Sequence, residues 1–429
     1  MQKFKLLPIT VAVAASLASL SSFAAETDLA ALEQRIQELE SQVGDIKYTD
    51  DQQQAVLTSE TNVPDGIVFS GYARYGAHYK SGDERYVDIG TTGRSVGRLG
   101  NEANGGEVQL AKLFEADNGA IWDIVFMADH WEADAWADDG GLSMKKMYAG
   151  VTNVFESQPE LYMWAGRDFH QRPQQGLNDY FWMTHDGQGA GFNNLDFGGA
   201  KLDMGFVGQV KGGLVNDNGR YAITSKLHSI NAGIGQLDLY ANYGFASDEA
   251  DSDVAGDPKV SDETAYLVGA TLGLGESNKL VVKYGDGADS SVYDLKGDYQ
   301  TLYASVEGSY AASEQFIIDY LVSYKDNSGS DLDRENTEYA GIVRPQYQWD
   351  DVHSTWLEAG YGMVDYDDDG EEKAWKVTLS QNVSLGGLPW SRPMLRFYTT
   401  VGDVETKGNT VKTTNVDTLS FGAMFEAWW

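Results

Sequence analysis

The last eleven residues of the chain alternate between two faces, and this alternation limits the folds that the chain can adopt. One face is wholly apolar, whereas the other mixes small, polar and aromatic residues. The apolar face holds Leu419, Phe421, Ala423, Phe425, Ala427 and Trp429, and the other holds Ser420, Gly422, Met424, Glu426 and Trp428. A period of two residues predicts a β-strand with one apolar face. A soluble β-sandwich and a membrane β-barrel both contain such strands.

The same period returns along residues 66–429. Within residues 66–80, aromatic and small residues alternate with polar and basic ones. Near residues 390–401, Leu395, Phe397 and Val401 alternate with Arg392, Arg396 and Tyr398. Clusters of Gly, Asp and Asn separate these segments, as expected for turns. At roughly 20 residues for a strand with its connection, residues 66–429 accommodate about 18 strands, and 16 also fit.

Composition favours the barrel over the sandwich. The chain has 24 Tyr, 11 Trp and 16 Phe but only 8 Pro, which indicates many strands rich in rings that sit at a membrane interface. It has no Cys, so disulfides do not stabilise it. Beyond the N-terminus no run of about 18 apolar residues occurs, which excludes a helical membrane protein. We therefore predict an all-β fold, a transmembrane antiparallel barrel with a short N-terminal coiled-coil helix.

The N-terminal residues divide into three further segments. Residues 1–24 read as a secretory signal peptide, with Lys3 and Lys5 before an apolar stretch and small residues before the expected cleavage after Ala24. Residues 25–45 carry apolar residues at spacings of 3 and 4, which predicts a short periplasmic coiled coil or a lone amphipathic helix. Residues 46–65 are polar and read as a linker before the barrel at 66–429. This organisation predicts the outer membrane of a bacterium.

Charge and motifs exclude other classes of protein. A net charge of −34 is too negative for a nucleic-acid binder. The acidic residues gather in stretches that we expect to be water-facing loops, at 129–140, 246–257, 285–294 and 365–373. No catalytic triad, metal-ligand cluster or phosphate loop is apparent, so we expect no enzyme activity, no metal and no cofactor.

Eight short motifs in order resemble the maltoporin family of sugar-specific outer-membrane porins. They are "GYAR" (71–74), "RLGNE" (98–102), "DHWEAD" (129–134), "MWAGRDFHQR" (163–172), "DYFW" (179–182), "GAGFNNLDFG" (189–198), "WSRP" (390–393) and the terminal "FGAMFEAWW". The resemblance implies a homotrimer of 18-stranded barrels in outer-membrane lipid, with an oligosaccharide as substrate. The N-terminal coiled coil is similar to that of the sucrose-porin branch, whose extension is longer.

The resemblance also implies individual site residues. An aromatic track for sugar would comprise Tyr72, Trp131, Trp390 and Trp428. The constriction and the polar track would comprise Arg74, Arg98, Lys145, Arg172, Asp179 and Phe181, with a narrowing loop at 170–187. Some positions depart from the family. Phe181 replaces a tyrosine, Lys145 replaces an arginine, a ring expected after "RLGNE" is missing, and Ala103 stands at a cysteine position. These departures weaken the expectation of tight maltodextrin specificity.

Three functions remain open from the sequence. The first is a sugar-specific porin, in which rings contact the C–H faces of a sugar and charged groups bond its hydroxyls during facilitated diffusion. The second is a general diffusion porin, which would be favoured if Tyr72, Trp390 and Trp428 faced lipid. The third is a secreted carbohydrate-binding protein or polysaccharide lyase with a β-sandwich.

Overall fold

Eighteen antiparallel strands close into one barrel in the computed structural model of the chain. The structure describes residues 47–48, 55–56, 61–82, 86–132, 141–210, 217–247, 250, 260–275, 277–408 and 414–429. The barrel confirms the predicted fold class and the count of 18, and it excludes the sandwich. The expected signal peptide (1–24), the coiled coil (25–45) and most of the linker (46–65) lie outside the described residues. No helix in the described ranges has the length and hydropathy needed to cross a membrane.

Two short pairs of strands accompany the barrel. The pair β1 (Lys47–Tyr48) and β2 (Ala55–Val56) precedes it, and the hairpin of β8 (Gln174–Gln175) and β9 (Tyr180–Phe181) interrupts it. The barrel strands are β3 (Val68–Gly82), β4 (Asn104–Glu115), β5 (Ile121–Glu132), β6 (Ser143–Thr152), β7 (Tyr162–Asp168), β10 (Gly187–Asp196), β11 (Lys201–Val210), β12 (Asp217–Asn231), β13 (Gln236–Ala246), β14 (Thr264–Leu274), β15 (Asn278–Asp286), β16 (Gln300–Ala311), β17 (Phe316–Ser328), β18 (Asn336–Gln348), β19 (His353–Tyr366), β20 (Glu371–Ser384), β21 (Met394–Lys407) and β22 (Thr414–Trp428).

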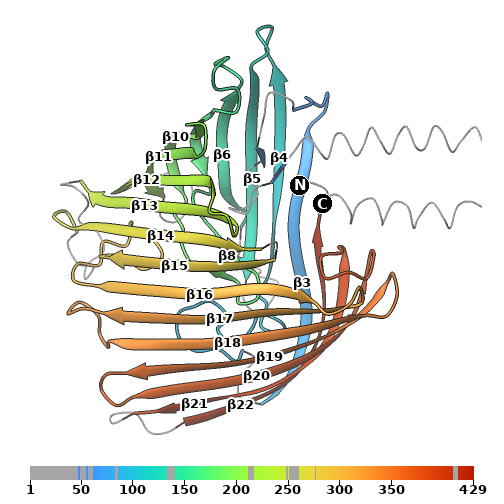
Figure 1. Cartoon of the computed structure of the whole chain (residues 1–429). Coiled ribbons are helices and arrows are strands. Elements are labelled where there is room, and N and C mark those ends of the chain that lie inside the picture. The colour runs from blue at the N-terminus through green and yellow to red at the C-terminus, as the bar shows by residue number, and fades with distance from the viewer. Residues whose placement is uncertain are drawn as a thin grey trace, which may run out of the picture.

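Each barrel strand pairs with its neighbours in the chain, and the last strand closes on the first. Figure 1 shows β3, in blue, running beside the red C-terminal strands. In the register of this closure Tyr72 lies opposite Trp428. The backbone N–H of Gly71 also donates to the carbonyl of Trp429 at 3.0 Å. Closure removes the free sheet edges, whose backbone groups would otherwise be unsatisfied in lipid.

Alternate residues of each strand face lumen and lipid, as the sequence period predicted. In β5, Trp122, Ile124 and Phe126 are exposed on the outside, whereas the residues between them are buried. The same division holds in β22, where Phe421 is exposed and Glu426 is 1% exposed. A barrel in a membrane needs this arrangement because lipid solvates only apolar side chains.

The two ends of the barrel differ in their connections. One end, here called the short-turn end, carries the start of β3, the end of β22 and tight turns such as 197–200 and 232–235. The opposite end carries longer connections, and two of them, residues 86–103 and 169–186, fold into the lumen. Backbone bonds join these two in-folded segments, from Arg94 to Asn178 at 2.5 Å and from Arg98 to Leu177 at 2.8 Å.

Apolar contacts hold the in-folded segments against the inner wall. Val87, Ile89 and Val96 pack on Val364 and Ala374. Leu177 of the other segment packs in the same way on Leu321 and Ile342. The barrel therefore has no single core, and its lumen is narrowed by loops that pack against the wall.

Two of the acidic stretches do not lie wholly where the sequence analysis placed them: residues 129–132 belong to β5, and residues 285–294 are not a water-facing loop. We expected residues 285–294 to be a water-facing loop, but Ala288, Val292 and Tyr293 are buried. Asp289 forms ion pairs with Lys283 at 3.4 Å and with Lys325 at 2.9 Å. The prediction was wrong there because two buried lysines pair with this carboxylate, which lets the neighbouring apolar residues of the loop pack away from water.

Candidate functional site

A cavity of about 1240 Å³ lies within the barrel between the in-folded segments and the short-turn end. Its wall combines strand residues, the turn at Pro389 and Trp390, and part of the hairpin segment from Arg172 to Phe181. Nine of the ten residues expected to form the site line this cavity: Tyr72, Arg74, Arg98, Trp131, Arg172, Asp179, Phe181, Trp390 and Trp428. The remaining one, Lys145, lies outside the lining.

The four rings of the expected track all line the cavity and do not face lipid. Tyr72 and Trp131 stack with their ring centroids 6.0 Å apart. Trp428 contacts the guanidinium of Arg392 at 4.4 Å from the ring centroid. Trp390 and Trp428 keep 45% and 44% of their surface exposed, so a ligand in the cavity can reach their faces.

A glycine on β4 makes room for the Trp131 ring. Trp131 belongs to β5 and is paired with Gly105, although the sequence analysis placed it in a loop. A Cβ atom on Gly105 would come within 2.4 Å of the Trp131 ring. The indole therefore lies across the glycine and reaches Tyr72 and the guanidinium of Arg74, which is 5.1 Å from its centroid. The Trp131 ring thus occupies the space above Gly105 in the "ANGG" stretch (103–106). The family resemblance predicted an aromatic residue in that stretch, which this sequence lacks.

Arg74 and Asp179 connect the barrel wall to the hairpin segment. Arg74 Nη2 donates to Asp179 Oδ2 at 2.7 Å, and Gln174 donates to the other oxygen at 2.5 Å. Burial raises the pKa of the Asp179 carboxyl, but Arg74 and Arg98 outweigh this effect and hold the pKa below its ordinary value. Asp179 is therefore an anionic anchor at neutral pH.

Arg172 occupies the narrowed part of the lumen between two rings. Its guanidinium lies 4.2 Å from the centroids of both Phe169 and Phe181. It also forms an ion pair with Asp186 at 3.2 Å. Burial raises the pKa of Asp186, although Arg172 acts in the opposite direction. Phe181 thus contacts the Arg172 guanidinium and also presents its ring to the cavity.

Glu426 organises a cluster that the sequence analysis missed. Its Oε1 accepts from Tyr72 at 2.7 Å and from Arg98 at 3.3 Å. Its Oε2 accepts from Arg392 Nε and Arg396 Nη2, both at 2.9 Å. The alternation of β22 placed Glu426 on the same face as Trp428, so its face was predictable. Its partners were not, because they come from three distant parts of the chain.

Lys145 faces inward because of a bulge. The pairing of β5 and β6 shifts register between Met127 and Ala128, which leaves Lys145 without an opposite residue. The bulge lets Lys145 and the neighbouring Lys146 both form ion pairs with inward carboxylates, Asp129 at 3.4 Å and Asp168 at 3.3 Å. Lys145 therefore lies in the wall beside the cavity.

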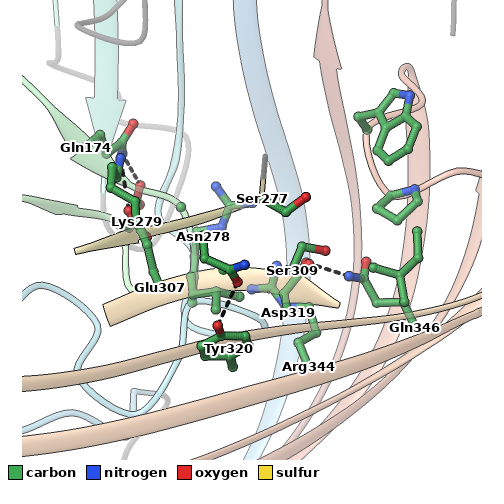
Figure 2. Close-up of a pocket in the computed structure, with 18 of the residues that line it drawn as sticks. Gln174, Ser277, Asn278, Lys279, Glu307, Ser309, Asp319, Tyr320, Arg344 and Gln346 are labelled. Carbon is green, nitrogen blue, oxygen red and sulfur yellow. Dashed lines mark hydrogen bonds and ion pairs between the residues drawn. The ribbon is translucent and has the colours of Figure 1, made fainter. Parts of the chain in front are cut away.

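The opposite wall of the cavity is polar, and none of the eight sequence motifs predicted it. Figure 2 shows Lys279 near Glu307, Asn278 near Tyr320, and Gln346 near Asp319. The Lys279–Glu307 pair is 3.1 Å long, Tyr320 donates to Asn278 at 2.7 Å, and Gln346 donates to Asp319 at 2.5 Å. Rings on one side and paired polar groups on the other create an amphipathic cavity.

Most charged groups of the cavity wall have a partner of opposite charge, either in the wall or just behind it. Besides the pairs above, Arg344 binds Glu358 and Asp238 lies 3.6 Å from Lys226. Across the described residues, no group of three or more His, Cys, Asp or Glu is placed to hold a metal ion. The wall therefore offers hydrogen-bonding groups with little unbalanced charge.

Solved structures with similar folds are distant in sequence. The anion-selective porin from Comamonas acidovorans has 12% identity and a TM-score of 0.43, covering 84% of this chain and 99% of that chain. OmpT of Vibrio cholerae has 12% identity and a TM-score of 0.40, covering 86% and 100%. Wzi of Escherichia coli, described as a carbohydrate-binding β-barrel, has 10% identity and a TM-score of 0.41, covering 83% of each chain.

The comparison with protein families is more specific. Residues 67–429 match the LamB porin family, which covers the barrel from its first strand to the C-terminus. The match agrees with the eight motifs and confirms the family resemblance seen in the sequence. The chain therefore belongs to the LamB porin family of outer-membrane channels.

Proposed function

We propose that this porin is a sugar-specific channel, which passes oligosaccharides across the outer membrane by facilitated diffusion. The observation that carries the proposal is the set of four rings that line the cavity: Tyr72, Trp131, Trp390 and Trp428. Aromatic faces attract the C–H faces of sugars, and each contact is weak enough to release the sugar to the next ring. A pore for ions and small solutes needs no such rings.

The pairing of charges supports a neutral substrate. Arg74, Arg172 and Arg392 line the cavity, and each has a carboxylate partner within 3.2 Å, the partner of Arg392 being Glu426, which also pairs with Arg98 and Arg396. A paired carboxylate or guanidinium retains lone pairs or N–H groups for a sugar hydroxyl while exerting little net field on an ion. The wall therefore favours hydroxyl groups over ions, despite the net charge of −34 for the whole chain.

The experiment is single-channel recording of the purified protein in planar bilayers. The ion current is titrated with maltose, sucrose, cellobiose and chitobiose, and with their longer homologues. We expect concentration-dependent block by at least one of these sugars, with affinity that rises with chain length. Currents that no sugar reduces at millimolar concentration would instead identify a general diffusion porin, the alternative function.

The assembly and the N-terminal residues belong to the same proposal. We infer a homotrimer with its barrels in outer-membrane lipid, and residues 25–45 in the periplasm on the side of the short-turn end. The start of β3 at this end supports that placement, because the linker 46–65 leads into it. Cross-linking of intact cells, and protection from added protease of a tag inserted after Ala24, test these two inferences.

A further inference from the structure

Gln346 and Trp356 face each other in the cavity wall without a bond between their side chains. They are register partners on β18 and β19, which brings their Cβ atoms to within about 5.5 Å. Both line the cavity, and their side chains are only 3% and 2% exposed. Each carries one buried polar atom without a hydrogen-bond partner, Oε1 in Gln346 and Nε1 in Trp356.

The chemistry of Asp319 sets the orientation of the Gln346 amide. Its carboxylate accepts a hydrogen bond from Gln346 Nε2 at 2.5 Å. A carboxylate oxygen accepts hydrogen bonds, so the amide nitrogen points toward Asp319 and the amide oxygen points away from it. Figure 2 shows the dashed contact between these two residues. The unpaired group of Gln346 is therefore a carbonyl oxygen, an acceptor.

The Trp356 indole is held by contacts to its ring, which leave the N–H unused. The ring packs with Leu99 and Met394 in one buried cluster. The guanidinium of Arg396 lies 5.1 Å from its centroid. The indole nitrogen only donates, so its unpaired group is a donor. A buried donor without a partner costs free energy, and the same is true of a buried acceptor.

An unpaired donor and an unpaired acceptor on register-paired residues define the chemistry of the missing partner. It must accept one hydrogen bond and donate another through the same atom, which a hydroxyl oxygen does. We propose that Gln346 and Trp356 form a subsite for one hydroxyl group of a passing sugar, which accepts from Trp356 Nε1 and donates to Gln346 Oε1. This inference rests on the proposed sugar channel and adds a specificity-determining pair to it.

The surroundings of the pair suit a sugar ring. Pro389 lines both the large cavity and a second cavity of about 10 Å³, which Gln346 and Trp356 also line. The next residue, Trp390, offers a half-exposed ring. A sugar that stacks on Trp390 would thus place hydroxyls near the pair. Because the small cavity has room for about one water molecule, an ordered water is the rival occupant.

The experiment measures sugar block in variants that remove one partner at a time. Trp356→Phe removes the N–H and keeps a ring, and Gln346→Met removes the amide at similar length. The matched control is Trp164→Phe on β7. The indole N–H of Trp164 is also buried and has no hydrogen-bond partner, but Trp164 does not line the cavity. The probe is whichever of maltose, sucrose, cellobiose and chitobiose blocks the wild-type channel most strongly.

We expect Trp356→Phe and Gln346→Met each to weaken block by roughly 2- to 12-fold, the loss of one hydrogen bond, while Trp164→Phe leaves it unchanged. The double variant should lose less than the product of the two single losses, because both act on one hydroxyl. Unchanged block in both single variants would overturn the subsite and leave an ordered water only.

A second measurement does not depend on the folding of any variant. Monodeoxy analogues of the same sugar are compared on the wild-type channel, and removal of one particular hydroxyl should weaken block by the same 2- to 12-fold. Equal block by all analogues would overturn the subsite while leaving the sugar channel intact. If no sugar blocks the wild-type channel, the proposed function itself has failed, and the subsite fails with it.

Discussion

Arg74 of β3 and Asp179 of the hairpin segment lie 2.7 Å apart and join the first barrel strand to the constriction. Their side chains are 6% and 17% exposed, so water screens the pair only weakly. Gln174 donates to the same carboxylate, which fixes its second oxygen. This ion pair between residues 105 positions apart is thus one of the contacts that hold the constricting segment against the wall.

Asp179→Asn should loosen the constriction. It removes a charge-assisted bond and leaves Arg74 buried without an anion, at a cost of about 1.5–3 kcal/mol. We expect larger single-channel conductance with more frequent current fluctuations. The control is Asp368→Asn in the turn after β19. This change removes the negative charge from an exposed ion pair between Asp368 and Arg334. Equal currents in wild type and Asp179→Asn would show that the segment is held by its other contacts.

Acidification should change the ion selectivity in two steps. The pKa of Asp186 is raised by burial, so this carboxyl binds a proton before Asp179 does as the pH falls. The pKa of Asp179 is lowered, so its pair with Arg74 contributes stability above the ordinary pKa of 3.8 and is lost only when the pH falls below that value. Each protonation leaves an arginine uncompensated, which should increase anion selectivity.

Reversal potentials in a salt gradient, recorded as the pH is lowered from 7 to well below the ordinary pKa of 3.8, measure these two steps. Asp186→Asn should abolish the step at higher pH and show raised anion selectivity already at neutral pH. If Asp186→Asn titrates like the wild type, another group is responsible for the first step.

Phe181→Ala should widen the constriction and weaken sugar binding. The change removes a ring from the cavity wall, while Arg172 keeps its contact with Phe169. We expect higher ion conductance and a loss of sugar block of roughly 2- to 12-fold, the value of one ring contact. Phe397→Ala on the lipid face is the control, since its side chain is 52% exposed on the outside. No change in either quantity would argue against a constriction at Phe181.

The two terminal tryptophans should have different roles. Trp428→Ala removes a ring from the cavity and should weaken sugar block by roughly 2- to 12-fold with normal assembly. Trp429→Ala removes a ring on the lipid side, whose centroid lies 5.7 Å from the centroid of the Phe69 ring. It should lower the amount of folded protein in the outer membrane and leave the sugar affinity of the remaining channels unchanged. Exchanged phenotypes would contradict the register of β22.

Deletion of residues 26–45 should leave trimers and conductance largely intact. The short coiled coil predicted for residues 25–45 would be marginal alone, whereas in the proposed trimer we expect contacts between barrels to bury far more surface. Native gel electrophoresis and bilayer recording of the shortened protein test this expectation. A monomeric product would make the N-terminal segment the principal contact between subunits.

The lumen and lipid faces of the strands at 66–80, 390–401 and 419–429 were predictable from the sequence. The face of a residue in a strand is a local property, because successive side chains point to opposite sides of the backbone. The alternation in β22 therefore placed Trp428 and Glu426 in the lumen and Trp429 on the outside. Length and turn spacing gave a strand count of 16 or 18, and the family motifs supplied the candidate site residues.

The partners of those residues were decided by the tertiary structure alone. Tyr72 donates to Glu426 across 354 positions only because β3 closes on β22. Trp131 crosses β4 only because Gly105 is its register partner, and Gln346 meets Trp356 for the same reason. Register, closure and the inward folding of loops depend on the summed contacts of many strands, which no local pattern encodes. The period of the sequence determines which way a side chain points, and the closed barrel determines what it contacts.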